Sequence, residues 1–308
     1  MTPHPEILLR NIDSRSKTKV IGLIKNGCTS RFMSVKCNNG NYVLSNTCSF
    51  DTIVQMLAVA YCDSTAYTKY VMEKKEESTL WQLIFCLLRD GVTVQTYRKR
   101  VEILSSLFSG EPILNGITYL SVEQSIDSML NMLLKNYESV QIEENCSSCK
   151  FERSEKKPFL TICVTEKMPT KRQLNLLINQ EMKQLYDSKI CQMCNGIIEV
   201  TVILGEHVFF NLINLNNTTD ALFMDTRILL NHIPKSISTP QTQYYLRGLG
   251  TTPDLQQSTT SYETIGHYHA HTFRHPINSW QIYDDVKEKV HSVNENTKVN
   301  LQIILYSK

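Results

Sequence analysis

Residues 46–50 read Asn-Thr-Cys-Ser-Phe, and a short apolar segment with helical spacing follows them: Ile53, Val54, Met56 and Leu57. This spacing predicts that a helix begins at Cys48. The unpaired N–H groups and the dipole of a helix N-terminus favour an anion, so they lower the pKa of a cysteine thiol placed there. A buried structural cysteine would show the same local pattern. We interpret Cys48 as a nucleophile because two further motifs provide the partners that a thiolate needs.

A histidine box stands far downstream, Gly266-His267-Tyr268, and is followed by Trp280-Gln281-Ile282-Tyr283-Asp284-Asp285. A histidine within hydrogen-bond reach of a cysteine takes the thiol proton and later protonates the leaving amine. We assign this role to His267. Asp284 or Asp285 would orient the imidazole and set its tautomer.

Two more histidines follow on the same expected strand. His267, His269 and His271 alternate along the chain, and alternate residues of a strand share one face. Such a face can bind a metal, but no carboxylate is interleaved here to complete a ligand set. We therefore expect His269 and His271 to face solvent.

Four of the ten cysteines form two CxxC pairs, Cys146 with Cys149 and Cys191 with Cys194. Four thiolates from two such pairs make a closed tetrahedral zinc site, which is structural and not catalytic. The chain between the pairs is longer than in a minimal zinc ribbon, so we expect an insertion with its own helix or strands. The alternatives are unliganded thiols or redox pairs.

Together these motifs resemble those of the ubiquitin-specific protease family of papain-like cysteine hydrolases. The family's cysteine box, G-L-x-N-x-G-N-T-C-Y-M-N-S-x-x-Q, is matched at Asn46, Thr47, Cys48 and Gln55. Its histidine box, G-H-Y followed by W-x-x-F-D-D, is matched at Gly266, His267, Tyr268, Trp280, Tyr283, Asp284 and Asp285. Residues 245–248 and 303–306 are weaker matches to two of the family's later strands.

The resemblance implies an α+β fold, the papain-like cysteine protease fold of ubiquitin-specific protease type, with a helical thumb, zinc-ribbon fingers and a β-sheet palm. The expected parts are an N-terminal extension at 1–31 and a catalytic domain at 32–308, with the thumb at about 48–138, the fingers at about 139–205 and the palm at about 206–308. Fingers and palm would hold ubiquitin or a ubiquitin-like protein, and its C-terminal tail would enter a cleft beside the nucleophile.

The resemblance also implies specific roles for site residues. Cys48 would be the nucleophile and His267 the general base and acid. Asp284 would orient the histidine, because the family uses the first Asp of the pair. A structural Zn²⁺ would bind the four paired cysteines: Cys146, Cys149, Cys191 and Cys194.

One position departs from the family pattern. The family has an oxyanion-stabilising Asn five residues before the cysteine, where this chain has Val43. Loss of one oxyanion donor costs about a hundredfold or more in rate. The backbone N–H of Cys48 remains, and Ser45 or Asn46 would be a replacement side-chain donor. A slow enzyme, an isopeptidase for SUMO or another ubiquitin-like protein, and an inactive protein that only binds such modifiers are therefore alternatives to a deubiquitinase.

The remaining pattern predicts a helical region followed by a β-rich one. Residues 32–44 contain Asn38-Asn39-Gly40 and predict a hairpin. From Cys48 to about residue 137, helical spacing predicts a lobe of about four helices. Thr170 and Gln173 form a capping box that opens another helix. Strands are predicted at 20–24, 159–164, 197–204, 208–215, 221–224, 243–247, 267–273, 279–283 and 300–306.

Composition excludes several classes of protein. Hydrophobic residues make up 42% of the chain and charged residues 20%, which favours a large core over disorder. The formal net charge of +2 provides no basic surface for nucleic acid, which argues against a zinc-finger nucleic-acid binder. Residues 1–19 contain no apolar signal-like segment and no run of 18 apolar residues occurs, so we expect neither secretion nor a membrane partner. We expect a cytoplasmic or nuclear protein with reduced thiols.

Overall fold

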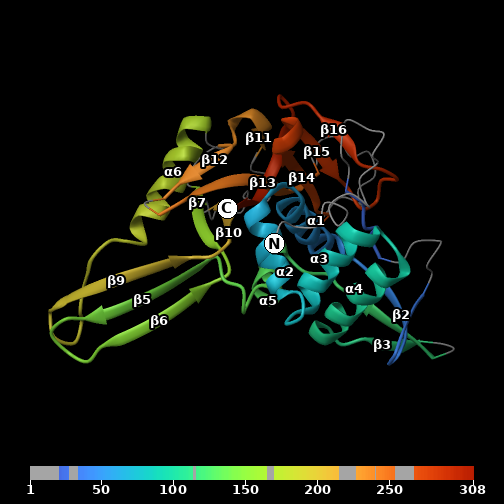
Figure 1. Cartoon of the computed structure of the whole chain (residues 1–308), viewed down its shortest axis with the longest axis horizontal. Helices are drawn as coiled ribbons and strands as arrows, with labels where there is room; N and C mark the ends of the chain where they lie inside the picture. The colour runs from blue at the N-terminus through green and yellow to red at the C-terminus, as the bar shows by residue number, and fades with distance from the viewer. Residues whose placement is uncertain are drawn as a thin grey trace.

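The computed structural model describes residues 21–27, 34–113, 116–164, 170–214, 227–239, 241–253 and 267–308. Most of the expected N-terminal extension, the expected strand at 221–224 and Gly266 lie outside these residues. The described chain forms a lobe of helices, a large curved sheet and a slender sheet that projects from the body (Figure 1). The fold is therefore mixed α+β, as the sequence predicts.

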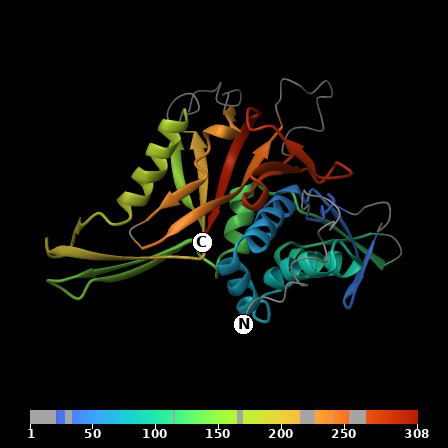
Figure 2. The same cartoon turned by 45° about the horizontal axis from the view of Figure 1, so that its top comes forward.

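The helical lobe is built around one buried helix. Its helices are α1 (Cys48–Asp63), α2 (Thr65–Lys74), α3 (Thr79–Asp90), α4 (Val94–Leu107) and α5 (Ile126–Leu133). Almost every residue of α1 is buried, because other helices pack against it on one side and the large sheet on the other (Figure 2). The helix begins at Cys48, as the apolar spacing predicts. Across the described ranges, no helix is both long and apolar enough to span a membrane.

The lobe also contains a small sheet, so the expectation of an all-helical region with about four helices is wrong. The strands, in order across this sheet, are β1 (Val35–Cys37), β2 (Gly40–Ser45), β4 (Ile117–Ser121) and β3 (Glu111–Ile113). β1 and β2 form the expected hairpin. β4 pairs in parallel with β2, and a parallel partner far along the chain leaves no tight turn in the sequence that would reveal it.

The large sheet has the strand order β16-β15-β14-β13-β17-β10-β7, with β11 paired to β17 and β12 to β13. Its strands are β7 (Leu160–Val164), β10 (His207–Asn214), β11 (Arg227–Leu229), β12 (Ser236–Ser238), β13 (Gln243–Thr252), β14 (His269–Arg274), β15 (Ser279–Tyr283), β16 (His291–Val293) and β17 (Lys298–Ser307). Two short 3-10 helices, η3 (Leu230–His232) and η4 (His275–Ile277), lie between strands. Strands β11, β12 and β16 were not predicted, because three residues show no periodicity.

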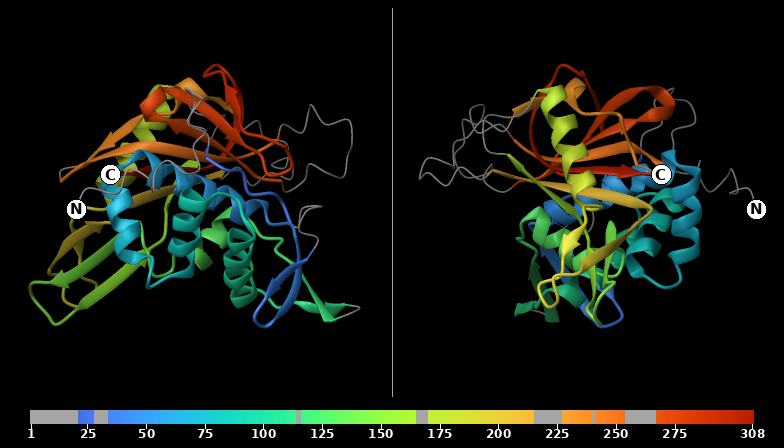
Figure 3. Two further views of the ribbon diagram at one scale, coloured as in Figure 1. Left: turned by 45° about the vertical axis from the view of Figure 1, so that its right-hand side comes forward. Right: turned by 90° about the vertical axis from the view of Figure 1, so that its left-hand side faces the viewer.

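Both faces of the large sheet are covered. Phe209 packs into the core around α1, whereas its neighbours Val208 and Phe210 pack into a second core on the opposite face. Helix α6 (Lys171–Gln184) covers that second face (Figure 3). Thr170 and Gln173 cap α6 reciprocally, which confirms the predicted capping box. The sheet is therefore a rigid, two-sided platform for the residues at its ends.

The projecting sheet has the order β6-β5-β9-β8, with β5 (Val140–Cys146), β6 (Glu152–Lys157), β8 (Lys189–Ile190) and β9 (Ile197–Leu204). β9 was predicted, but β5 and β6 were not. The sequence of β6, Glu-Arg-Ser-Glu-Lys-Lys, carries charge on both faces because it is an exposed edge strand. Charged edge strands of this kind resist pairing with other molecules. The two CxxC pairs lie at the far end of this sheet.

Candidate active site and cysteine cluster

Cys48 is the first residue of α1, and only 7% of its surface is exposed. Thr47 precedes the helix but does not cap it with its side chain. Its hydroxyl instead donates a hydrogen bond to Asp51 Oδ2 at 2.6 Å. The Thr47 hydroxyl is therefore engaged with the Asp51 side chain and does not cap the N–H groups at the start of α1.

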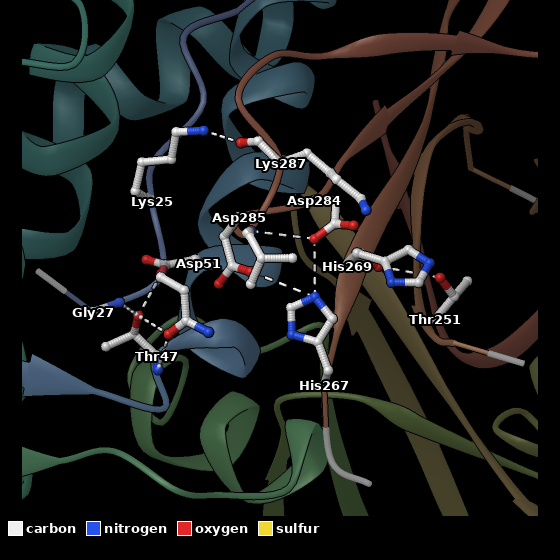
Figure 4. A network of polar contacts seen from close by, with 12 residues as sticks. Lys25, Gly27, Thr47, Asp51, Thr251, His267, His269, Asp284, Asp285 and Lys287 are labelled. Carbon is white, nitrogen blue, oxygen red and sulfur yellow. Dashed lines mark hydrogen bonds and ion pairs between the residues drawn. The ribbon is translucent and has the colours of Figure 1, made fainter. Parts of the chain in front are cut away.

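Strands β14 and β15 bring His267 and Asp284 together. The strands pair with Ala270 opposite Tyr283, so the residues just before β14 and just after β15 lie at one end of the sheet. His267 Nε2 donates a hydrogen bond to Asp284 Oδ1 at 2.9 Å (Figure 4). A second hydrogen bond joins His267 to Cys48. The structure thus connects the three residues that the sequence selected.

The charges of His267 and Asp284 depend on each other. Burial alone would lower the pKa of His267, but the hydrogen bonds with Asp284 and Cys48 outweigh burial and raise that pKa to about 10. Burial would likewise raise the pKa of Asp284, but its hydrogen bond with His267 outweighs this and lowers the pKa. His267 is therefore held as a charged imidazolium between the Asp284 carboxylate and the Cys48 side chain.

Asp285 has a different environment from Asp284. Its Oδ1 lies 3.6 Å from His267 Nε2, yet neither carboxylate oxygen has a hydrogen-bond partner among the described residues. Burial, followed by the nearby charge of Asp51, raises the pKa of Asp285 to about 8. Of the two acids that the sequence left open, Asp284 is therefore the one that hydrogen-bonds the histidine as a carboxylate.

The expectation that His269 and His271 face solvent is wrong. They are 8% and 4% exposed, because β14 is an inner strand of a sheet that is covered on both faces. Their rings follow that of His267 in a row, with centroids 6.0 Å and then 5.0 Å apart. Burial lowers the pKa of His269 to about 4 and also lowers that of His271. Both are neutral core histidines.

Residues 21–27 form an unexpected wall of this site. They were expected to begin with a strand, but residues 21–24 form none. The Asn26 Oδ1 atom accepts a hydrogen bond from the N–H of Thr47 at 3.1 Å, and the Gly27 N–H donates to Thr47 Oγ1 at 2.8 Å. The Asn26 N–H donates to the carbonyl of Asp285 at 3.1 Å. Asn26 thus bridges the residue before Cys48 and the loop after β15.

Arg100 anchors residues 21–27 from the interior of the protein. It is fully buried and donates to both oxygens of Asp51, at 2.9 and 3.0 Å. It also donates to the carbonyl oxygens of Lys25 and Gly27. One guanidinium therefore joins α4, the first turn of α1 and the segment 21–27.

The sequence of this segment contains part of the family's cysteine-box pattern. Residues 22–27 read Gly-Leu-Ile-Lys-Asn-Gly, which carries the Gly-Leu and the later Gly of the family's cysteine box, with Asn one position further along. The β1–β2 hairpin separates this half of the pattern from Asn46-Thr47-Cys48. Val43, which was aligned with the oxyanion Asn, instead lies within β2 opposite Tyr119.

The four paired cysteines converge on one point. Cys146 Sγ lies 3.4 Å from Cys194 Sγ, and Cys149 Sγ lies 3.7 Å from Cys191 Sγ. Zinc–sulfur bonds of about 2.3 Å in a tetrahedron place sulfurs about 3.8 Å apart, so the four thiols fit a zinc ion after small shifts. This cluster and the set of His267 with Asp284 and Asp285 are the two groups with metal-ligand proximity in the described chain.

Backbone geometry at the cluster also favours a metal. The N–H of Ser148 approaches Cys146 Sγ and that of Gly196 approaches Cys194 Sγ, both at 3.4 Å. Such N–H···S contacts stabilise thiolates, the form that binds zinc. A Cβ at Gly196 would lie 2.6 Å from Ser148 Oγ and 3.1 Å from Cys194 Sγ, so only glycine fits between the two turns. The residues present fit a structural metal.

No protein-family model matches the chain. Over 280 residues, 85% of the chain, it is 22% identical to the 120.7 kDa protein in the NOF-FB transposable element of Drosophila melanogaster, and it spans 25% of that protein's length. Among solved structures, the SAGA Ubp8/Sgf11/Sus1/Sgf73 DUB module matches with a TM-score of 0.50 and 12% identity, over 96% of this chain and 71% of that one. The same module bound to ubiquitin aldehyde matches with a TM-score of 0.49 and 13% identity, over 100% and 71%. The first of these structures shows that the chain has a deubiquitinase-like fold.

Proposed function

We propose that this chain is a thiol-dependent isopeptidase that cleaves after the C-terminal glycine of ubiquitin. The main support for the proposal is the set of hydrogen bonds that joins Cys48, the first residue of the buried helix α1, to His267, and His267 to Asp284. The fold shared with a deubiquitinase module supports ubiquitin as the modifier. SUMO and other ubiquitin-like proteins would require the same chemistry, and the experiment below separates them.

The reaction divides into acylation and hydrolysis. The Cys48 thiol gives its proton to His267, and the thiolate attacks the carbonyl carbon of the modifier's terminal glycine. The proton on His267 passes to the lysine amine as the C–N bond breaks, which leaves a thioester on Cys48. Water then gives a proton to His267 and attacks the thioester carbonyl. The C–S bond breaks, which releases the modifier with a free C-terminal carboxylate, and the proton on His267 returns to the Cys48 sulfur. Asp284 keeps the imidazole oriented through both stages.

The oxyanion that forms in each stage needs hydrogen-bond donors, and Val43 provides none in its side chain. We assign this role to the backbone N–H of Cys48 and the side-chain amide of Asn26. The Asn26 carbonyl oxygen is already bonded to the N–H of Thr47, which orients the amide and leaves its NH₂ group for the substrate. One donor of this kind lowers the barrier by about 3 kcal/mol.

The remaining parts have supporting roles in the proposal. The helical lobe acts as the thumb, the large sheet as the palm, and β5, β6, β8 and β9 as fingers that hold the body of the modifier. When bound, zinc at Cys146, Cys149, Cys191 and Cys194 joins the two turns at the fingertip and takes no part in the reaction. Every cysteine that the structure describes is a free thiol, which supports a cytoplasmic or nuclear location.

Probes of ubiquitin and of SUMO with an electrophilic C-terminus test the proposal. We expect wild type to form a covalent adduct with the ubiquitin probe, Cys48→Ala to form none, and His267→Ala to react at least a hundredfold more slowly. His269→Phe is the control for a buried histidine of the same strand without a place in the reaction. An adduct with the SUMO probe alone would reassign the modifier. Absence of any adduct in a folded protein would make the chain a binding protein.

A further inference from the structure

Three buried carboxyl groups lie close together at the proposed site, those of Asp51, Asp284 and Asp285 (Figure 4). Arg100 is paired with Asp51. His267 hydrogen-bonds Asp284. Asp285 lies near the same imidazole, but its carboxyl oxygens have no hydrogen-bond partner in the part of the chain that the structure describes.

The Asp285 carboxylate points at the histidine from inside the protein. It is 5% exposed, and both of its oxygens lack a hydrogen-bond donor within the described ranges. A buried carboxylate without a donor costs several kcal/mol in solvation free energy unless a cation or a proton joins it. Its Oδ1 lies 3.6 Å from His267 Nε2, on the same side of the ring as Asp284.

The spacing of these ligand atoms suits a small transition-metal ion. Zinc bonds of 2.0–2.2 Å to nitrogen and carboxylate oxygen in a tetrahedron place the ligand atoms about 3.3–3.6 Å apart. The distances from His267 Nε2 are 2.9 Å to Asp284 Oδ1 and 3.6 Å to Asp285 Oδ1. The second distance agrees with this spacing and the first is a few tenths of an ångström short of it. All three ligand atoms lie within 4.8 Å of one another, so they can form three ligands of a site whose fourth is water.

We propose that His267, Asp284 and Asp285 form a second zinc site, and that Zn²⁺ bound there switches the isopeptidase off. The inhibition rests on the proposed function, whereas the binding does not. Zinc takes the place of the proton on His267 Nε2, and this proton passes to solvent. The ring then keeps only its Nδ1 proton. Giving that proton to the leaving amine would leave a metal-bound imidazolate, so the amine is not protonated and the C–N bond does not break.

Calorimetric titration of the full chain with Zn²⁺ tests the binding. The parent protein is Cys48→Ser, saturated with zinc at the fingertip and freed of excess metal, so that the nucleophilic thiol is not a ligand. We expect one further equivalent of zinc to bind. We expect Asp285→Asn in this parent to weaken that binding at least tenfold. His291→Ala, which removes an exposed histidine of β16, is the control for adventitious surface binding and is expected to change nothing.

The outcomes separate the two proposals. No further equivalent in the parent, or equal binding by Asp285→Asn, would overturn the zinc site. If Asp285→Asn does not fold, Asp284→Asn takes its place with the same expectation. A wild-type chain that binds the extra zinc but never reacts with a ubiquitin probe would lose the proposed function and keep the site. In a reactive chain, zinc should slow cleavage of a lysine-linked ubiquitin conjugate by wild type at least tenfold more than cleavage by Asp285→Asn.

Discussion

Replacing Arg100 with Met removes the group that joins three elements behind the site. The guanidinium is fully buried, pairs with Asp51 and donates to two backbone carbonyls. Breaking a buried ion pair by removal of one partner costs about 3–5 kcal/mol, because the other charge stays buried. Each carbonyl that loses its donor adds about 1 kcal/mol. We expect Arg100→Met to lower the free energy of unfolding by about 5–7 kcal/mol.

Urea denaturation followed by tryptophan fluorescence measures this loss, since Trp81 and Trp280 are both buried. Arg98→Met is the matched control, because Arg98 is an exposed arginine of the same helix, and it should change the free energy by less than about 1 kcal/mol. Adding Asp51→Asn to Arg100→Met should recover part of the loss by removing the unpaired charge. A free energy of unfolding for Arg100→Met within about 1 kcal/mol of wild type would show that this guanidinium is not needed to join the three elements.

Three further outcomes are expected. Chelation of the fingertip metal should lower the melting temperature and should release one zinc per chain. Cys163→Ser, at an exposed thiol outside the cluster, should change neither result, and a metal-free native protein would contradict the site. His207 is buried and neutral, with burial lowering its pKa to about 4. The unfolded chain therefore binds the proton first, and His207 alone should lower the free energy of unfolding by about 3 kcal/mol as the pH drops from 6.5 to 4. His207→Gln should remove this contribution and leave that of buried His269 and His271, and an unchanged slope would refute the assignment. Thr170→Ala should cost about 1 kcal/mol through the lost cap of α6, Thr170→Ser should cost little, and equal loss in both would show that the cap is unimportant.

Local patterns in the sequence were sufficient for the elements that depend on neighbouring residues. The start of α1 at Cys48, the capping box of α6 and the strand at 279–283 follow from periodicity, side-chain capping and turn residues within a few positions. Each CxxC pair is also local, since it needs only its own turn, but the meeting of the two pairs depends on tertiary structure. The local features involve hydrogen bonds and contacts between residues that are close along the chain.

Tertiary structure decided everything that depends on long-range pairing. His269 and His271 are buried because α1 and the neighbouring strands cover β14, which alternation along one strand does not reveal. Residues 117–121 form the strand β4 because β2 lies beside them and pairs with their backbone.

Tertiary structure also decides whether Asp284 or Asp285 bonds the histidine, and it places residues 21–27 beside the site. The register of β14 and β15 sets the distance from His267 to Asp284 and to Asp285. Asn26 reaches the start of α1 only because the inserted hairpin folds away and buried Arg100 satisfies the backbone of residues 25–27. Local sequence is therefore enough to identify the chemical groups and the start of α1. The fold determined which groups meet, because burial and hydrogen bonding between distant segments exist only once the chain has packed.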